Sequence, residues 1–135
     1  MSKIESFLET LQRKKNTPTV TNPYLDDGVV NNLRLYLEYM FEHMSVQPGR
    51  RVLLVGEAPG YKGCRITGIP FSSVKVLMST EHPLFDTIKS QLYLSDDALR
   101  DMASENTATI VWHYLVNKKT VPLFWNSFPF HPHPK

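Results

Sequence analysis

The chain has 135 residues, of which 41% are hydrophobic and 21% charged, values that suit one globular domain with a modest core. The net charge of +2 is compatible with a nucleic-acid partner but is too small to indicate one. The sequence has no apolar run long enough for a membrane span and no signal-peptide core, and its single cysteine excludes an internal disulfide or an iron–sulfur site. We therefore predict a cytoplasmic protein that binds no metal or other cofactor and has no membrane partner.

Two amphipathic helices are predicted in the first third of the chain. Ser2 and Glu5 have the spacing of a capping box, and apolar residues follow at helical spacing through about residue 14. Residues 16–28 are rich in Pro, Asn and Asp, which predicts a loop. A second helix is indicated by apolar residues on one face, and it should end before Pro48. These residues are Leu33, Leu37, Met40, Phe41 and Met44.

The rest of the chain predicts two buried strands separated by helices. Residues 50–55 are apolar and β-branched enough for a short buried strand, and residues 121–127 resemble it. Between them, residues 72–80 and 82–92 are predicted helices, and a cap cluster at Ser95 begins a short helix through Met102.

Residues 107–119 fit two periodicities. Alternating apolar residues would make them a strand, whereas Ala108, Val111, Trp112 and Leu115 would share one face of a helix. Lys118 and Lys119 suit a helix C-terminus, so a helix is favoured.

Strands joined by helical crossovers predict a parallel sheet in an α/β fold, with ligands outside the carboxyl ends of the strands. The loop after Val55 and the segment after Trp125 are therefore the candidate site.

The loop after the first strand holds a carboxylate among residues that keep the backbone tight. Glu57 lies between Gly56 and the turn formed by Pro59 and Gly60. A carboxylate there could orient a water molecule or stabilise a developing positive charge. Alternatively, Glu57 caps the following turn or pairs with Lys62 or Arg65 on the surface. The loop lacks the spacing of a P-loop and of a dinucleotide fingerprint.

Two further side chains could bind a nucleic-acid base. The amide of Asn126 can donate and accept side by side, as reading a base edge requires; otherwise it caps a turn before Pro129. Phe71 could stack on a base, although a core position is the commoner place for Phe. His131 and His133 are too few for a zinc site, and we expect a stiff, exposed segment there.

Three motifs together resemble the uracil-DNA glycosylase superfamily. They are GEAPG at 56–60, TGIPF at 67–71 and WNSFPFHPH at 125–133. The resemblance implies a three-layer α/β/α fold with a central, mostly parallel sheet. It also implies hydrolysis of the N-glycosidic bond of uracil, or of a related damaged base, in DNA, as in base excision repair. The target base would be flipped out of the duplex.

The resemblance implies a role for each motif residue. Glu57 would be the catalytic acidic residue that positions water and balances the cationic sugar. Phe71 would stack on the base, and Asn126 would read the polar edge of uracil and help to reject cytosine. The pocket floor would be formed by Gly56, Ala58, Pro59 and Gly60.

Two departures from this family pattern also lead to predictions. Cys64 is the only cysteine, so no iron–sulfur cluster is expected, and no histidine pairs with it to make a nucleophile. The family's later histidine-containing loop has no counterpart, so we expect the domain to be incomplete at its C-terminus. A sheet interrupted there would leave strand edges unpaired, which invites self-association.

Two other functions are consistent with the same sequence. The fold could bind nucleic acid or a nucleotide without hydrolysis, in which case Lys62, Arg65 and Lys75 would contact phosphates. The chain could also be inactive by itself.

Overall fold

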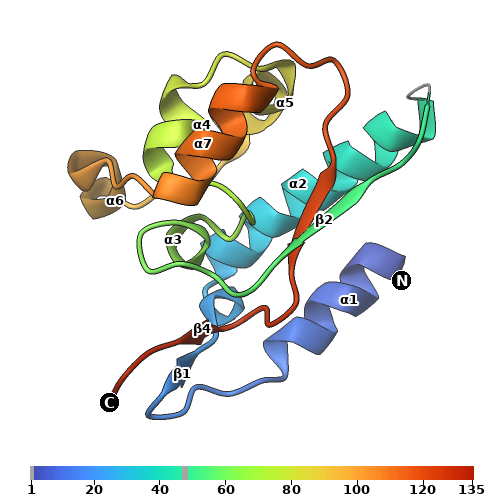
Figure 1. Ribbon diagram of the computed structural model, residues 1–135. Coiled ribbons are helices and arrows are strands. Elements are labelled where there is room, and N and C mark those ends of the chain that lie inside the picture. Colours follow the sequence, from blue (N-terminus) through green and yellow to red (C-terminus); the bar gives the residue numbers. More distant parts are fainter. Residues whose placement is uncertain (1, 47–48) are drawn as a thin grey trace.

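The computed structural model describes residues 2–46 and 49–135 and shows a helix-rich mixed α/β fold (Figure 1). No helix within these ranges is both long and apolar enough to cross a membrane. In chain order the elements are α1 (Lys3–Gln12), β1 (Val20–Thr21), η1 (Pro23–Leu25), α2 (Asp27–Val46), β2 (Leu53–Gly56), α3 (Cys64–Thr67), α4 (Val74–Ser79), α5 (Pro83–Ile88), η2 (Lys89–Gln91), α6 (Asp96–Asp101), α7 (Asn106–Leu115), β3 (Leu123–Asn126) and β4 (His131–Pro132).

The N-terminal helices form as the sequence predicts, with different limits. Ser2 caps α1, where its hydroxyl oxygen accepts a hydrogen bond from the Glu5 amide at 3.1 Å. Helix α2 begins at the end of the predicted loop, where the Asp26 carboxylate accepts from the Val29 amide at 3.0 Å. Arg34 of α2 pairs with Glu5 of α1 at 2.6 Å, which ties the two helices together. The predicted end of α2 at Pro48 lies outside the described residues.

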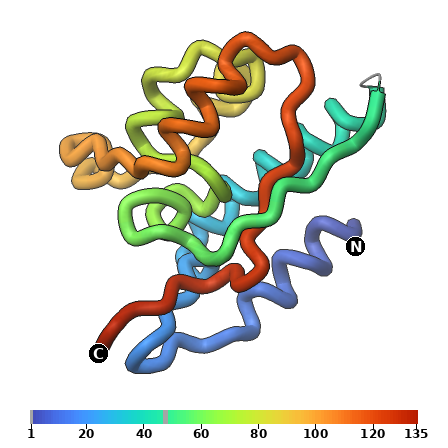
Figure 2. Tube along the Cα trace, viewed as in Figure 1, coloured from blue at the N-terminus to red at the C-terminus, as the bar shows by residue number. Residues whose placement is uncertain are grey.

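The predicted parallel pairing is confirmed by β2 and β3. Leu53 lies opposite Leu123, and the register continues to Gly56 opposite Asn126. Helices α4, α5 and α7 gather on one side of this pair, and α1 lies on the other (Figures 1 and 2). Helix α7 begins at Asn106 and covers residues 107–115 of the predicted segment, so the helical alternative is correct there.

The core fixes β3 from both sides. The Trp112 ring of α7 lies 5.6 Å from the Phe124 ring, and the Phe7 ring of α1 lies 5.2 Å from the Trp125 ring. The Phe124 amide also donates to the hydroxyl of Tyr36 in α2 at 2.8 Å. Because successive strand residues point to opposite faces, Phe124 and Trp125 bind β3 to different helices.

Strand β2 corrects the prediction of a buried first strand. Leu53 and Val55 are 57% and 52% exposed, and Val52 and Leu54 are exposed as well. An apolar strand becomes buried only when other elements cover its faces and edges, and the helices cover β3 instead. The described residues place β3 on one edge of β2 and no strand on the other.

The histidine-proline segment is also different from the prediction of a stiff, exposed tail. His131–Pro132 forms β4, which pairs antiparallel with Val20–Thr21 of β1. His131 is buried, and its Nδ1 lies 2.8 Å from the carbonyl oxygen of Pro59. The segment therefore supports the loop that carries Glu57.

We expect Gly68→Ala to destabilise the fold more than Gly49→Ala, by about 1–3 kcal/mol. Both glycines have positive φ, so alanine costs about 1–2 kcal/mol of backbone strain at either position. A Cβ on Gly68 would lie 2.5 Å from the backbone oxygen of Val29, whereas one on Gly49 meets none of the described atoms within 4 Å. Urea unfolding of the two variants measures the difference, and equal losses would contradict the steric account.

Candidate active site

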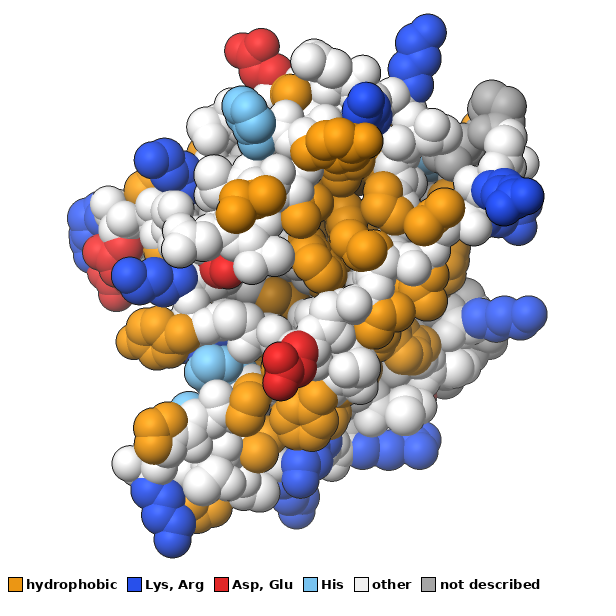
Figure 3. Space-filling view, in the orientation of Figure 1, with side chains coloured by type: hydrophobic (Ala, Val, Ile, Leu, Met, Phe, Trp, Pro, Cys, Tyr) orange, Lys and Arg blue, Asp and Glu red, His pale blue; other side chains and the backbone are white. Residues whose placement is uncertain are grey.

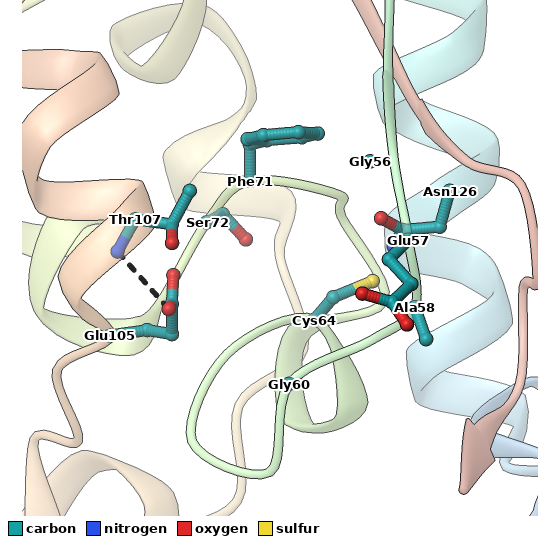
Figure 4. Close-up of a pocket in the computed structure, with 10 residues that line it drawn as sticks. All are labelled: Gly56, Glu57, Ala58, Gly60, Cys64, Phe71, Ser72, Glu105, Thr107 and Asn126. Atoms are coloured by element: carbon teal, nitrogen blue, oxygen red, sulfur yellow. Dashed lines mark hydrogen bonds between the residues drawn. The ribbon is translucent and has the colours of Figure 1, made fainter.

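A cavity of about 210 Å³ lies at the carboxyl ends of β2 and β3 (Figure 4). Six of the seven residues that the motifs single out line it, whereas Pro59 is buried and does not. The cavity is smaller than the roughly 300–1,000 Å³ typical of sites for drug-sized ligands, which suits a single small ring. It is lined by Gly56, Glu57, Ala58, Gly60, Cys64, Phe71, Ser72, Glu105, Thr107 and Asn126.

Backbone hydrogen bonds hold the two strand ends together. The amides of Ser127 and Phe128 donate to the carbonyl oxygens of Gly56 and Glu57, each at 2.9 Å. The Glu57 backbone is therefore fixed while its side chain is exposed. The surface pair with Lys62 or Arg65 is not seen: within the described ranges no ion pair involves Glu57, and Arg65 lies over the Tyr61 ring instead, at 4.4 Å.

Gly56 allows Phe71 and Asn126 to approach the strand end closely. A Cβ at this position would lie 2.7 Å from Asn126 Oδ1 and 2.8 Å from the Phe71 ring. Both distances are below any ordinary carbon contact, so a larger residue would displace one of the two side chains. The first glycine of the GEAPG motif thus brings the aromatic ring and the amide together.

Phe71 is held in a strained position beside the cavity. Its φ of 56° lies in the left-handed region, which is uncommon for a bulky residue. Trp112 donates from Nε1 to the Phe71 carbonyl oxygen at 2.9 Å, and the Phe124 ring lies 5.1 Å from the Phe71 ring. Strain of this kind persists where the surroundings fix it, often at functional sites. Half-buried Phe71 is therefore part of both the core and the cavity wall.

Asn126 is a buried amide without a partner. Its side chain is only 5% exposed, and no hydrogen bond to it occurs among residues 2–46 and 49–135. Asn32, also buried, donates to the carbonyl oxygens of Thr67 and Tyr93 and accepts from the Tyr93 amide. Buried polar groups are nearly always bonded to protein or to water, so this amide is free to bind a molecule in the cavity. The turn-capping alternative for Asn126 would need a hydrogen bond that the described structure lacks.

Glu105 is a second carboxylate of the cavity, and no motif of the sequence indicates it. It lies across the cavity from Glu57 in Figure 4. Its oxygens accept from the amides of Thr107 at 3.1 Å and Ala108 at 2.7 Å, which caps α7. Glutamate is not among the residues that usually cap helices, so its position before α7 gave no signal. Because it is engaged with α7, Glu105 is less available than Glu57 for chemistry.

Cys64 lines the cavity as a protonated thiol. Burial raises the pKa of this thiol to about 12, although its contact with the Tyr24 hydroxyl at 3.6 Å opposes that shift. At neutral pH the thiolate fraction is then about a thousandfold below that of an unperturbed cysteine. This environment does not suit a nucleophile.

We therefore expect Cys64 in the folded chain to react with iodoacetamide at pH 7 at least about a hundredfold more slowly than in the urea-unfolded chain. The reason is the raised pKa together with burial. Labelling followed by mass spectrometry, with and without urea, measures the ratio. Equal rates would show an exposed, ordinary thiol.

The cations that could contact phosphates do not surround the cavity. Lys62, Arg65 and Lys75 are absent from its lining, and Arg65 and Lys75 line two other depressions of the surface. Nor do the described ranges contain a cluster of three or more His, Cys, Asp or Glu side chains that could hold a metal ion.

Comparisons with protein families, curated proteins and solved structures gave no match to the chain.

Proposed function

We propose that the chain carries a uracil-DNA-glycosylase-like site that hydrolyses the N-glycosidic bond of uracil, or of a related damaged base, in DNA. Asn126 carries this proposal, because its unpaired buried amide meets Phe71 and Glu57 at one small cavity. A stacking ring, a side chain that donates and accepts, and a carboxylate are what the excision of a flat polar base requires. The proposed architecture is the three-layer α/β/α fold of that family, and the parallel pair β2–β3 would belong to its sheet.

Recognition of the base follows from the two walls of the cavity. Phe71 stacks on the ring of the flipped base, a contact worth about 1–3 kcal/mol. Asn126 donates to the O4 oxygen of uracil and accepts from its N3–H. Cytosine presents an acceptor at N3 and a donor at N4, so it opposes the amide in that orientation.

Hydrolysis uses Glu57 on the exposed side of the cavity. As the bond between the base and C1′ breaks, its electron pair moves to the base and the sugar becomes cationic. The Glu57 carboxylate stabilises that cation and orients a water molecule whose oxygen bonds to C1′, and it accepts the proton that the water loses. Gly56, Ala58 and Gly60 leave the approach to the base open, and Pro59 holds the loop through its contact with His131.

Uracil release from DNA tests the proposal directly. We expect the chain to release the base from oligonucleotides that contain one uracil, faster when it faces guanine than when it faces adenine, because a mispaired base is easier to flip. Alkaline cleavage at the abasic site and gel electrophoresis measure the product. DNA binding that weakens with salt, without any base release, would replace the proposal by a non-catalytic binding module.

A further inference from the structure

The outer edge of β2 is apolar and exposed. Leu53, Leu54 and Val55 are all exposed, and hydrophobic side chains gather over the centre of the face on which β2 and β3 lie (Figure 3). Soluble proteins usually protect such an edge with lysine, proline, a bulge or a covering segment. Strand β2 has none of these residues within Leu53–Gly56, and the described residues place no strand beyond it.

The hydrogen-bond pattern shows which backbone groups face this edge. Leu123 and Ser127 donate to the carbonyl oxygens of Val52 and Gly56, so the even-numbered residues of β2 bond to β3. In a strand the odd-numbered residues then direct their N–H and C=O groups to the opposite side. Leu53 and Val55 therefore present their backbone groups at the outer edge.

The far edge of β3 is already occupied. There the Phe124 amide donates to the Tyr36 hydroxyl of α2. The two-stranded sheet consequently has one edge that can accept another strand. If the outer edge of β2 pairs with the same edge of a second copy, neither copy keeps an open strand edge. The assembly would therefore be a closed symmetric dimer and not an extended fibre.

We propose that two copies of this chain associate through antiparallel pairing of β2 with β2, about a two-fold axis at Leu54. Antiparallel strands exchange hydrogen bonds between residues that both face the shared edge, so odd-numbered residues must lie opposite odd-numbered residues. Within β2 this condition allows an axis at any of the four residues Leu53–Gly56. The charges beside the strand select one of these four registers.

Only the axis at Leu54 brings Arg51, two residues before β2, beside Glu57 of the second copy, the residue directly after β2. The Glu57 carbonyl oxygen accepts from the Phe128 amide on the β3 side, so it is the two side chains that would meet across the shared edge. In that register Leu53 lies opposite Val55, and Leu54 meets its own equivalent on the other face. An axis at Leu53 would place Arg51 opposite Val55, and an axis at Val55 would place Leu53 opposite Glu57. An axis at Gly56 would place Val55 opposite Glu57. Opposite charges in cross-strand positions stabilise pairing, whereas a charge opposite a leucine gains nothing.

The dimer would contain a continuous sheet in the order β3-β2-β2-β3. It would also bring Arg51 of the second copy to the rim of the cavity, because Glu57 lines the cavity and ends the pairing. Self-association is measured without DNA, so it can fail or succeed independently of the proposed base release.

Reciprocal charge reversal tests both the partner and the register. We expect Arg51→Glu and Glu57→Arg each to weaken dimerisation by about tenfold or more, because each dimer then contains two like-charged pairs. An equimolar mixture of the two variants should restore it, since each interface pair is again Arg with Glu. Arg50→Glu is the matched control: it makes the same charge change but lies opposite Ala58, and it should leave dimerisation unchanged.

Sedimentation velocity over a range of protein concentrations measures these constants, with circular dichroism to confirm that each variant folds. Val55→Lys, an exposed edge lysine, should also give monomers. A wild-type chain that stays monomeric at about 100 µM would overturn the proposal. So would a dimer that Arg51→Glu and Arg50→Glu weaken equally, or a mixture that fails to recover.

Discussion

Glu57→Gln is expected to slow uracil release by about 10²–10⁴-fold, the usual contribution of a positioned general base. Glutamine keeps the size of the side chain but removes the negative charge and the ability to take a proton from water. The free energy of unfolding of the monomer should change little, because within one chain the Glu57 side chain is exposed and forms no ion pair with the described residues. Single-turnover kinetics on a uracil-containing oligonucleotide measures the loss.

Glu105→Gln is the informative comparison, since it changes a second carboxylate of the same cavity. Its oxygens already accept two amides at the start of α7, so we expect a loss of stability of about 0.5–2 kcal/mol and a much smaller loss of rate. Glu9→Gln, an exposed position on α1, controls for charge alone. If Glu105→Gln abolished release and Glu57→Gln did not, the two carboxylates would have to exchange roles.

The position of the candidate site could be predicted because it depends on local patterns. The apolar runs before Glu57 and Asn126 indicate strands, and parallel strands bring their carboxyl ends to one edge of a sheet. Glu57, Phe71 and Asn126 consequently line one cavity although they are separated by up to 69 residues in the sequence. Gly56, which allows Phe71 and Asn126 to lie close to the strand end, is also part of the recognisable GEAPG motif.

The features that could not be predicted depend on contacts between distant segments. The apolar residues of β2 suggest burial, but burial is decided by what packs over a strand, and the helices pack over β3. His131 is buried because β4 pairs with β1, and nothing in the local sequence of either segment specifies that partner. Glu105 enters the cavity because it caps α7. These errors share one cause, which is that local patterns do not identify tertiary neighbours.

Asn126→Ala should separate activity from stability. We expect kcat/KM for uracil release to fall by about ten- to hundredfold, the cost of losing one bidentate base contact, and the preference for uracil over cytosine to fall similarly. The free energy of unfolding should stay within about 1 kcal/mol of the wild type or rise, because the substitution removes a buried amide that has no partner in the described structure.

Asn32→Ala is the matched control, because it removes a buried amide that is fully bonded. Its loss leaves two carbonyl oxygens and one amide without partners, which should cost about 3 kcal/mol or more. Urea unfolding of both variants, beside uracil release, gives the comparison. If Asn126 were only a structural cap, its replacement would destabilise the fold as that of Asn32 does. Opposite outcomes at two buried asparagines would show that Asn126 is kept unpaired for a ligand.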